Sequence, residues 1–508
     1  MIRAERTPGD RFPDTIPHLL EWRAARADPS ASWLRFEDDT WTFPDVLAEV
    51  DRFAVGLADR GVVQGDTVAI LLGNRPETLF AWFAANRLGA IAMPLDPAYK
   101  PHELGGVLRL ASPRAFVVAD DLRSAYIDEA SEASPTTNVV SPVQLARSGS
   151  NAPRAPVYAN DVAVLLATSG PSGAPKAVMQ THRTYTLTAE AFPWWLGLDA
   201  SDRLLCALPL FHVNAQAYST MGALGCGAEL ALLARFSSSR FWNDVRRHGA
   251  TEVNALGAMV HALLASAPRP SDREHSLRTC YAALALSEEK HRAFEERFGV
   301  TMTVGYGLSE TTFGTVWPRA TPAPPYGTIG MLRQHPRLGV INRGRVVRED
   351  GTDAGAGETG ELWLSSPAMM RGYLFDPDGT EAAFEGQWFR TGDLVRRDAS
   401  GIFTFVSRKM DVLRRRGENV AACEIEIALL AHGTLLEAAV VGVPSSLGDD
   451  EVVAFVVPRP GASVDPEVLR AFVRERLAEH KVPARVHVRS ALPRTASERI
   501  AKHLLSET

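Results

Sequence analysis

The sequence is poor in cysteine and lysine and has no long apolar segment. Its four cysteines in 508 residues lie far apart without metal-ligand spacing, and we interpret them as buried thiols: Cys206, Cys226, Cys280 and Cys423. No apolar run approaches the roughly 18 residues of a membrane-spanning helix. The first 22 residues mix both charges with prolines, unlike a signal peptide. We therefore expect a cytoplasmic protein with no membrane partner.

Charge of one sign is also lacking, since 54 basic residues oppose 60 acidic ones for a net charge of −6. Without a basic stripe or a long block of like charge, nucleic acid is not an expected partner. Hydrophobic residues make up 45% and charged residues 22%, which excludes a disordered or fibrous chain. The length predicts about three packing units. Only six basic residues are lysines, so a lysine in a chemically suggestive position carries extra weight.

The first third of the chain alternates strand-like and helix-like patterns. Residues 67–72 form a short apolar run, Pro76 opens a helical pattern, and residues 90–94 read as the next strand. This spacing predicts βαβ units and a mainly parallel sheet, in an α/β fold. Residues 339–364 predict a small antiparallel β unit. The tail beyond Val406 contains a charged connector, two helical patterns and a strand-like stretch, which is typical of a separate small α+β domain.

A loop rich in glycine and hydroxyl side chains follows the strand-like run at 162–167. Its sequence is Thr168-Ser169-Gly170-Pro171-Ser172-Gly173-Ala174-Pro175-Lys176. Glycines let backbone amides approach an anion, hydroxyls donate to its oxygens, and a lysine adds a mobile positive charge. The segment therefore favours a phosphate cradle, with a flexible surface loop as the alternative. Its spacing is not that of the Walker motif.

The segment TSGPSGAPKAVMQTH, residues 168–182, closely resembles the phosphate loop of the adenylate-forming superfamily, which includes acyl-CoA synthetases, luciferases and nonribosomal adenylation domains. Pro171 and Ala177 are mild departures. Further family motifs follow in order: Gly305–Thr311 resembles YGxTE, Glu361 and Gly372-Tyr373 resemble GE…GY, Phe389–Asp393 resembles YRTGD, and Arg408 with Gly417–Asn419 resembles GR…GEN. The stretches LFHVNAQ, SSSRFW and LSEEKHRAFEERFGV look most like the carnitine-CoA-ligase-like branch.

The resemblance implies a large N-terminal domain, residues 1–408, made of stacked, mainly parallel sheets with helices plus a small β unit. A small mobile α+β domain, residues 411–508, would follow a hinge near 409–411. The chemistry implied is attack of a carboxylate on the α-phosphate of ATP, which expels pyrophosphate. Because both reactants are anions, catalysis is mostly charge neutralisation and alignment.

The resemblance also implies a role for each matched residue. Thr168, Ser169, Gly170, Ser172, Gly173 and Lys176 would hold the ATP phosphates, Glu310 would carry Mg²⁺, Tyr306 would stack on adenine with Gly307 and Thr311 beside it, and Asp393 and Arg408 would bind the ribose. His212 falls where relatives place a gate beside the acyl pocket; a polar side chain satisfied by its neighbours is the alternative. We expect Asn214, Gln216, Asn254, Ala283, Leu284 and Gly305 near that pocket. Unpaired amides there would disfavour a plain alkyl chain and favour a short, polar or aromatic acid.

The C-terminal motif departs from the family pattern. Where relatives read close to PRTATGKIxK, residues 492–502 place Glu498-Arg499 at the usual Gly-Lys. Either Arg499 substitutes for the family's catalytic lysine, or Lys502 reaches in from one helical turn away, or adenylation has been relaxed because the acid is unusual. Met410 stands where relatives usually carry Asp or Lys at the hinge, which weakens the inference of a CoA step without forbidding rotation.

The sequence thus predicts an ATP- and Mg²⁺-dependent adenylating enzyme, a carboxylate–CoA ligase with CoA as second substrate, acting as a monomer or homodimer. A second hypothesis keeps adenylation but passes the activated group to an amine, or activates nitrite to diazotise an arylamine, as in secondary metabolism. A third is a weakly catalytic nucleotide-binding homologue. The third fits less well with the complete phosphate loop, Glu310 and Asp393.

Overall fold

The computed structural model describes residues 11–146, 153–169, 175–283, 286–317, 325–409, 412–415, 418–444, 450–477, 479–494 and 500–505. The chain forms two compact units. The first contains residues 1–343 and 365–387, and the second contains residues 344–364 and 388–508. The predicted boundary and hinge at 409–411 stay predictions, and residues 410 and 411 lie outside the described part of the chain.

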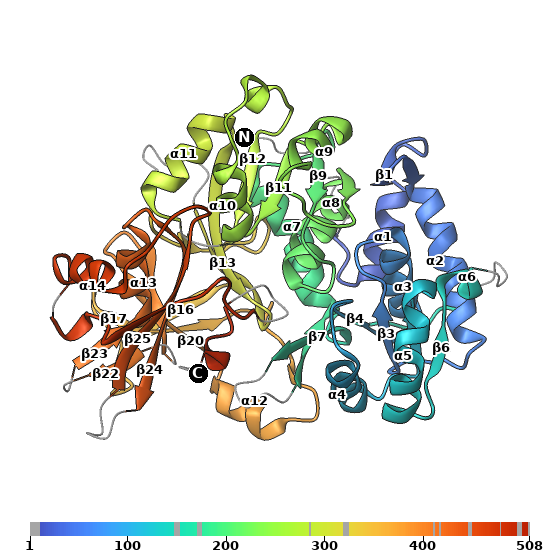
Figure 1. The fold of residues 1–508 in the computed structure, drawn as a ribbon. Helices are drawn as coiled ribbons and strands as arrows, with labels where there is room; N and C mark the ends of the chain where they lie inside the picture. Colours follow the sequence, from blue (N-terminus) through green and yellow to red (C-terminus); the bar gives the residue numbers. More distant parts are fainter. Residues whose placement is uncertain are drawn as a thin grey trace. The chain divides into compact units, whose positions relative to one another are not determined.

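The first unit is built on two sheets. The smaller has seven strands in the order β18-β8-β7-β4-β3-β5-β6. Their bounds are β3 Thr67–Leu71, β4 Ile91–Pro94, β5 Ala115–Val118, β6 Asn138–Val140, β7 Val162–Ser169, β8 Pro175–Thr181 and β18 Gly372–Tyr373. Strands β3 to β7 pair in parallel, whereas β8 is antiparallel to both β7 and β18. The helices between these strands are α3 Pro76–Arg87, α4 Pro101–Ala111, α5 Asp120–Ala133 and α6 Pro142–Leu145. Figure 1 shows α3 beside β3 and β4.

The βαβ unit at residues 67–94 illustrates why this part folds as predicted. Every residue of β3 is buried, as the continuous apolar run requires of a strand covered on both faces. Pro76 occupies the first turn of α3, where its missing N–H is not needed, and Glu77 lies at the positive end of the helix dipole. Almost all of α3 is buried, which makes it a core helix.

The larger sheet has nine strands in the order β15-β14-β13-β12-β11-β9-β10-β1-β2. Their bounds are β1 Ser32–Phe36, β2 Asp39–Thr42, β9 Arg203–Cys206, β10 Glu229–Leu232, β11 Glu252–Ala255, β12 Thr279–Ala282, β13 Thr301–Leu308, β14 Thr311–Val316 and β15 Met331–Leu332. Its central pairs, from β1 to β13, are parallel. The remaining elements of this unit are α1 Ile16–Ala24, α2 Phe43–Ala58, α7 His182–Leu196, the π-helix η1 Asn214–Thr220, α8 Met221–Cys226, α9 Phe241–His248, α10 Gly257–Ala265, η2 Pro270–Arg273, α11 Glu288–Phe298, α12 Pro377–Ala383 and β19 Phe384–Glu385.

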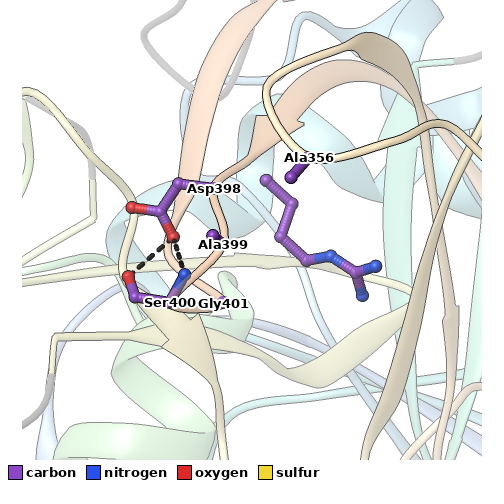
Figure 2. Close-up of a pocket in the computed structure, with 6 residues that line it drawn as sticks. Ala356, Asp398, Ala399, Ser400 and Gly401 are labelled. Carbon is purple, nitrogen blue, oxygen red and sulfur yellow. Dashed lines mark hydrogen bonds between the residues drawn. The ribbon is translucent and has the colours of Figure 1, made fainter.

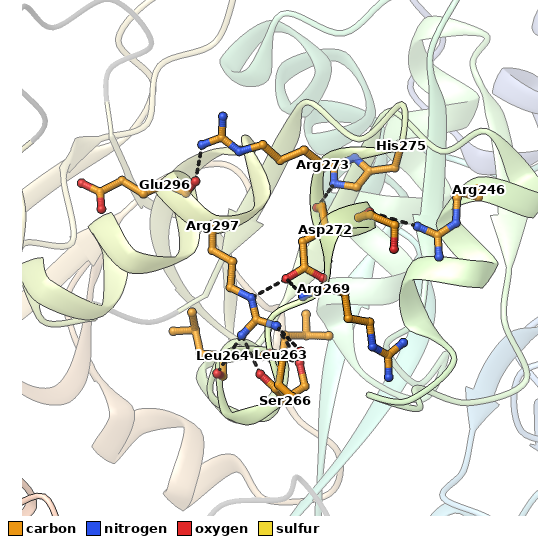
Figure 3. Close-up of polar contacts among 12 residues, drawn as sticks. Arg246, Leu263, Leu264, Ser266, Arg269, Asp272, Arg273, His275, Glu296 and Arg297 are labelled. Carbon is orange, nitrogen blue, oxygen red and sulfur yellow. Dashed lines mark hydrogen bonds and ion pairs between the residues drawn. The ribbon is translucent and has the colours of Figure 1, made fainter.

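A partly buried arginine fixes the connections around β11 to β13. Arg297, near the end of α11, donates to Oδ2 of Asp272 in η2 at 2.7 Å and to the carbonyls of Leu264 and Ser266 at 3.0 and 2.7 Å (Figure 3). Because α10 follows β11 and α11 precedes β13, this one side chain ties together the segments next to two strands that both pair with β12.

The second unit combines a small antiparallel sheet with an α+β C-terminal part. The sheet contains β16 Arg343–Val347, β17 Thr359–Ser365, β20 Trp388–Arg397 and β21 Phe403–Arg408. The C-terminal part contains β22 Val412–Arg415, β23 Glu418–Ala421, α13 Ala422–Leu430, β24 Leu435–Pro444, β25 Asp450–Pro458, α14 Pro466–Arg474, η4 Glu479–Lys481, β26 Arg485–Val488 and η5 Lys502–Leu504. Residues of α13, α14, β24 and β25 share one hydrophobic core.

The predicted fold class is confirmed, with mainly parallel sheets in the larger unit and an α+β C-terminal part. One detail was wrong: Cys206 and Cys280 are buried, but Cys226 and Cys423 are partly exposed. Cys226 ends α8 and Cys423 lies in the first turn of α13, and such positions are less enclosed than the strand positions of the other two. None of the described helices combines the length and apolarity needed to span a bilayer.

Candidate active site

The predicted phosphate loop is held by a hairpin. In β7 and β8, Thr168 pairs with Lys176, and Ser169 pairs with Pro175, so the two strands bring both ends of the loop together. Gly170, Ser172 and Gly173 lie between them, outside the described residues. The described ends of the loop, Ser169 and Pro175, are therefore held side by side by the pairing of β7 and β8.

Lys176 and Glu310, predicted from separate motifs, lie on either side of Tyr373. The ammonium of Lys176 is 4.6 Å from the centre of the Tyr373 ring, and its Nζ is 2.9 Å from Oδ2 of Asp376. The Tyr373 hydroxyl donates to Oε1 of Glu310 at 3.1 Å. Strand β18 places Tyr373 beside Val178 of β8, and the carbonyl of Glu310 accepts from the amide of Met370. The three segments therefore form one polar cluster.

The charges of this cluster shift two pKa values. Burial, and then the neighbouring Glu310 carboxylate, raise the pKa of Tyr373, so that its hydroxyl remains a donor. The hydrogen bond from Lys176 is the main cause that lowers the pKa of Asp376, which also accepts from the amide of Gly379 at the start of α12. The neutral phenol of Tyr373 thus lies between the Lys176–Asp376 ion pair and the Glu310 carboxylate.

The predicted acid-pocket residues gather at the carboxyl ends of three adjacent parallel strands. Asn254 is in β11, Ala283 directly follows β12, and Gly305 is in β13. Asn254 pairs with Tyr281 in β12, and Tyr281 pairs with Thr303, so their side chains share one face of the sheet. In open α/β sheets this edge is where ligands bind. Leu284 lies outside the described residues.

The π-helix η1 covers this face. The Asn254 side chain, 1% exposed, donates to the Ser219 hydroxyl of η1 at 2.9 Å, while its Oδ1 has no hydrogen-bond partner among the described residues. Asn214, at the start of η1, also has a buried Oδ1 to which no residue in the described part of the chain donates. π-Helical turns are rare and concentrate at functional sites. A buried amide oxygen without a donor is uncommon in folded proteins, so each of these two side chains is a candidate for contact with a ligand.

Two other pocket candidates have different surroundings. Gln216 is fully buried, donates to the carbonyl of Leu210 at 2.7 Å and accepts from the Tyr185 hydroxyl, so its amide supports η1 from inside. His212 is partly buried with its ring 4.4 Å from that of Phe211. Their placement near an acid stays a prediction. The contacts of Gln216 favour a structural role.

The nucleotide residues predicted on β13 and β14 are adjacent. Tyr306 is partly buried and pairs with Thr315, and Thr311 is fully buried with its hydroxyl accepting from the amide of Phe313. Glu310 lies in the turn between the two strands. The side chain of Gln180 in β8 donates to the carbonyl of Ser309 at 2.5 Å, which fastens this turn to the phosphate-loop hairpin.

In the second unit the two predicted ribose ligands pair with one another. Nε of Arg408 is 3.0 Å from Oδ1 of Asp393, with the alignment of an ion pair rather than of a linear hydrogen bond. Asp393 is buried while Arg408 is largely exposed. Glu361 supports the same strands, since its carboxylate accepts from the amide of Gly392 at 3.1 Å and from Nζ of Lys409 at 3.2 Å.

Two residues, Lys502 and Arg499, are candidates for the role of the family's catalytic lysine. Nζ of Lys502 is 2.8 Å from Oε1 of Glu426, which also accepts from the amide of Val440. Lys502 is therefore tied to the interior of its own domain. Arg499 lies outside the described residues, in a segment whose ends meet where Arg494 pairs with Ile500.

Sequence reasoning missed several residues. Tyr373 was noted only as part of a motif, and Asp376, Tyr281 and Arg333 were not considered. The glycines of Gly305-Tyr306-Gly307 were the available signal, because glycine in a strand marks close approach of another group. A surface hollow at the β20–β21 turn, lined by Ala356 and residues 397–401, contains no predicted site residue; there Asp398 accepts from the amide and hydroxyl of Ser400 (Figure 2).

Comparison with known proteins identifies the class. The family model for AMP-binding enzymes matches residues 20–374, and that for the AMP-binding enzyme C-terminal domain matches residues 424–499. The chain belongs to the AMP-binding enzyme family, the adenylate-forming class of ATP-dependent, AMP-forming ligases. The superfamily predicted from the motifs is thereby confirmed.

Individual relatives refine this comparison. The chain is 28% identical over 482 residues to crotonobetaine/carnitine–CoA ligase of Salmonella paratyphi C, which covers 91% of this chain and 92% of that relative. Among solved structures, O-succinylbenzoate coenzyme A synthetase from Bacillus subtilis, in complex with ATP and magnesium ion, matches with a TM-score of 0.86 and 28% identity over 96% and 99% of the two chains. ATP-bound MatB from Rhodopseudomonas palustris matches with a TM-score of 0.87 and 25% identity over 96% and 98%.

Proposed function

We propose that this protein adenylates a small, polar or aromatic carboxylic acid with ATP and Mg²⁺ and then transfers the acyl group to CoA. The observation that carries the proposal is the cluster in which Tyr373 lies between Lys176 and Glu310. In this cluster a cation and a carboxylate lie beside the β7–β8 hairpin, which supports the predicted roles of Lys176 at the phosphates and of Glu310 at Mg²⁺. The names of the relatives, which are CoA ligases, support CoA as the acceptor.

The donor set at Glu310 fits magnesium. Mg²⁺ prefers oxygen ligands and is commonly held by one or two carboxylates together with substrate phosphates. Glu310 offers one carboxylate whose Oε1 is oriented by Tyr373, leaving the rest of the coordination sphere for phosphate oxygens and water. When bound, the ion would neutralise charge on the pyrophosphate leaving group.

Within the first half-reaction, the acid's carboxylate oxygen attacks the α-phosphorus of ATP and the bond to pyrophosphate breaks. Lys176 and the hydroxyls of Thr168, Ser169 and Ser172 would hold the β- and γ-phosphates, because cations and hydroxyl donors stabilise the charge that develops there. Asp393 and Arg408 would bind the ribose. Arg499 would approach the reacting carboxylate, and the ion pair of Lys502 with Glu426 supports this choice over Lys502.

The test is pyrophosphate release by the full-length chain with ATP and Mg²⁺ across a panel of small acids and nitrite, each with and without CoA. We expect release that needs a carboxylic acid and is sustained only by CoA. Turnover with nitrite, or with an amine and indifferent to CoA, would replace the proposed acceptor. Nucleotide binding without pyrophosphate release from any member would overturn adenylation. Lys176→Ala and Glu310→Gln should each lower release, and Lys290→Ala, at a partly exposed lysine of α11 outside the predicted site, is the control.

A further inference from the structure

A buried arginine lies behind the strand that carries Gly305 and Gly307. Arg333 is 0% exposed, and its guanidinium donates to the carbonyls of Thr315 and Thr312 at 2.9 and 2.5 Å. It also donates to the hydroxyls of Tyr218, at 2.5 Å, and of Tyr281. No carboxylate among the described residues lies within ion-pair distance of Arg333. A buried charge without a counter-ion is costly and is seldom retained without a reason.

The two tyrosines occupy the space beside the two glycines. A Cβ on Gly305 would overlap the Tyr281 hydroxyl and ring, and a Cβ on Gly307 would lie 2.9 Å from the Tyr218 hydroxyl. Both glycines point to the same face of β13, the face shared by Asn254 and Tyr281. The Tyr218–Arg333–Tyr281 cluster therefore lies directly against the strand at which the acid is proposed to bind.

The two tyrosine hydroxyls differ in whether they have a hydrogen-bond acceptor. Arginine can only donate, so both hydroxyls accept from Arg333, and each still needs an acceptor for the hydrogen bond that it can donate itself. Tyr218 donates to the carbonyl of Thr312 at 2.9 Å. For the proton of Tyr281, which is 1% exposed, the described residues provide no acceptor. Burial raises the pKa of Tyr281, so this proton stays on the hydroxyl at neutral pH.

The aromatic rings around the arginine exclude one kind of ligand. The Arg333 guanidinium carbon is 4.6 Å from the Trp195 ring centre, 4.8 Å from that of Tyr218 and 5.6 Å from that of Tyr281. Such a set of rings is the cage that proteins use to bind a quaternary ammonium group. Here an internal cation already fills it, so a trimethylammonium acid would meet repulsion instead of a cage.

We infer that Tyr281, held by Arg333, is a specificity-determining residue whose hydroxyl donates a hydrogen bond to a second carboxylate on the acid. The substrate class is therefore a short dicarboxylic acid. This inference rests on the proposed adenylation function. A dianionic acid supplies both missing partners, an acceptor for Tyr281 and a negative charge near the uncompensated Arg333. Arg333 acts through Tyr281 and is a positioning residue.

The test compares acids of one chain length with different ends: succinate, butyrate and 4-(trimethylammonio)butanoate, with malonate and glutarate as length variants. Binding is read as the rise in melting temperature of the full-length chain with α,β-methylene-ATP and Mg²⁺, and turnover as kcat/KM for pyrophosphate release. We expect at least one dicarboxylate to exceed butyrate by about tenfold or more, as a hydrogen bond to a charged group provides. The trimethylammonium acid should be the weakest.

Variants then test whether Tyr281 and Arg333 cause the preference for dicarboxylates over butyrate. Tyr281→Phe keeps the ring and should reduce the dicarboxylate-to-butyrate ratio of kcat/KM about tenfold to a hundredfold, through a higher KM for the dicarboxylate. Tyr126→Phe, which removes another buried tyrosine hydroxyl that donates to the carbonyl of Tyr99, should leave the ratio unchanged. Arg333→Met should abolish the preference and Arg333→Lys should restore part of it. If Arg333→Met fails to fold, Tyr281→Phe decides alone.

The possible results separate the two proposals. Pyrophosphate release from panel acids without a preference for dicarboxylates, or a preference that survives Tyr281→Phe, would overturn this inference and leave adenylation standing. Stronger binding of the trimethylammonium acid than of succinate would do the same. Binding of a dicarboxylate with no release from any acid would instead contradict the proposed function. If no acid of the panel binds and none gives pyrophosphate release, the dicarboxylate assignment is overturned.

Discussion

The hydroxyl of Tyr373 donates a 3.1 Å hydrogen bond to Oε1 of Glu310. This bond joins two motifs that are 63 positions apart in the sequence, and it fixes one lone pair of the carboxylate that is proposed to hold Mg²⁺. Residues that orient a metal ligand commonly matter almost as much as the ligand itself. The ring of the same tyrosine meets the ammonium of Lys176, so one side chain orders both charges.

Tyr373→Phe should therefore weaken use of Mg²⁺ and ATP without unfolding the protein. The ring and its contact with Lys176 remain, and only the bond to Glu310 is lost, which predicts a decrease in kcat/KM for ATP of about tenfold to a hundredfold. The measurement is initial-rate pyrophosphate release over a Mg²⁺ titration. The half-saturating Mg²⁺ concentration should rise in the variant. An unchanged Mg²⁺ dependence would show that Glu310 needs no such orientation, and Tyr126→Phe is again the control.

We expect Lys502 to contribute to stability and Arg499 to contribute to catalysis. Because Lys502 pairs with Glu426 and is 22% exposed in its side chain, Lys502→Met should lower the free energy of unfolding by about 1 kcal/mol or less and leave adenylation unchanged. Arg499→Ala should slow adenylation about 10²- to 10³-fold with an unchanged melting temperature. Single-turnover acyl-adenylate formation and thermal melting measure the two effects. The reverse pattern would assign catalysis to Lys502.

Gly305 should tolerate no side chain. An alanine Cβ would overlap the Tyr281 hydroxyl and ring carbons, and overpacking of this kind costs about 1–3 kcal/mol. Gly305→Ala should accordingly lower the melting temperature. In the matched control Gly106→Ala, the new Cβ lies 3.6 Å from Pro175 in ordinary contact and should leave stability unchanged or slightly higher. Equal melting of both single variants would contradict the close packing at Gly305.

Local patterns in the sequence predicted the elements well where one segment determines its own structure. The strand at 67–72 and the helix after Pro76 were recognisable because residues close together in the sequence determine their burial and capping. Lys176 and Glu310 were predictable from motifs, but the tyrosine between them was not assigned a role. Its position depends on β18 pairing with β8, a contact between segments almost 200 residues apart.

The Tyr218–Arg333–Tyr281 cluster shows the same limit more sharply. Its members come from a π-helix, a central strand and the residue after a two-residue strand, and no spacing in the sequence relates them. An isolated arginine in a sequence is ordinarily read as a solvent-exposed residue. Only the packing of β12 against β13 and η1 reveals that this one is buried, charged and without a carboxylate.

His182 gives the stability of the first unit a defined pH dependence. Its ring is 1% exposed, its Nδ1 accepts from the amide of Ile16 at 3.3 Å, and burial lowers its pKa to about 4. The unfolded chain binds a proton at this histidine near pH 6.5, whereas the folded chain does not until about pH 4. The full contribution is therefore present above pH 6.5 and is lost as the pH falls toward 4, by about 3 kcal/mol over the window. Denaturant unfolding between pH 7.5 and 4.5 should show this decline.

In His182→Asn the amide oxygen can still accept from Ile16. This variant should reduce the slope of the free energy of unfolding against pH by the equivalent of about one proton. Because both forms are neutral at pH 7.5, any difference there measures packing alone, and parallel slopes at lower pH would place the acid sensitivity in another histidine.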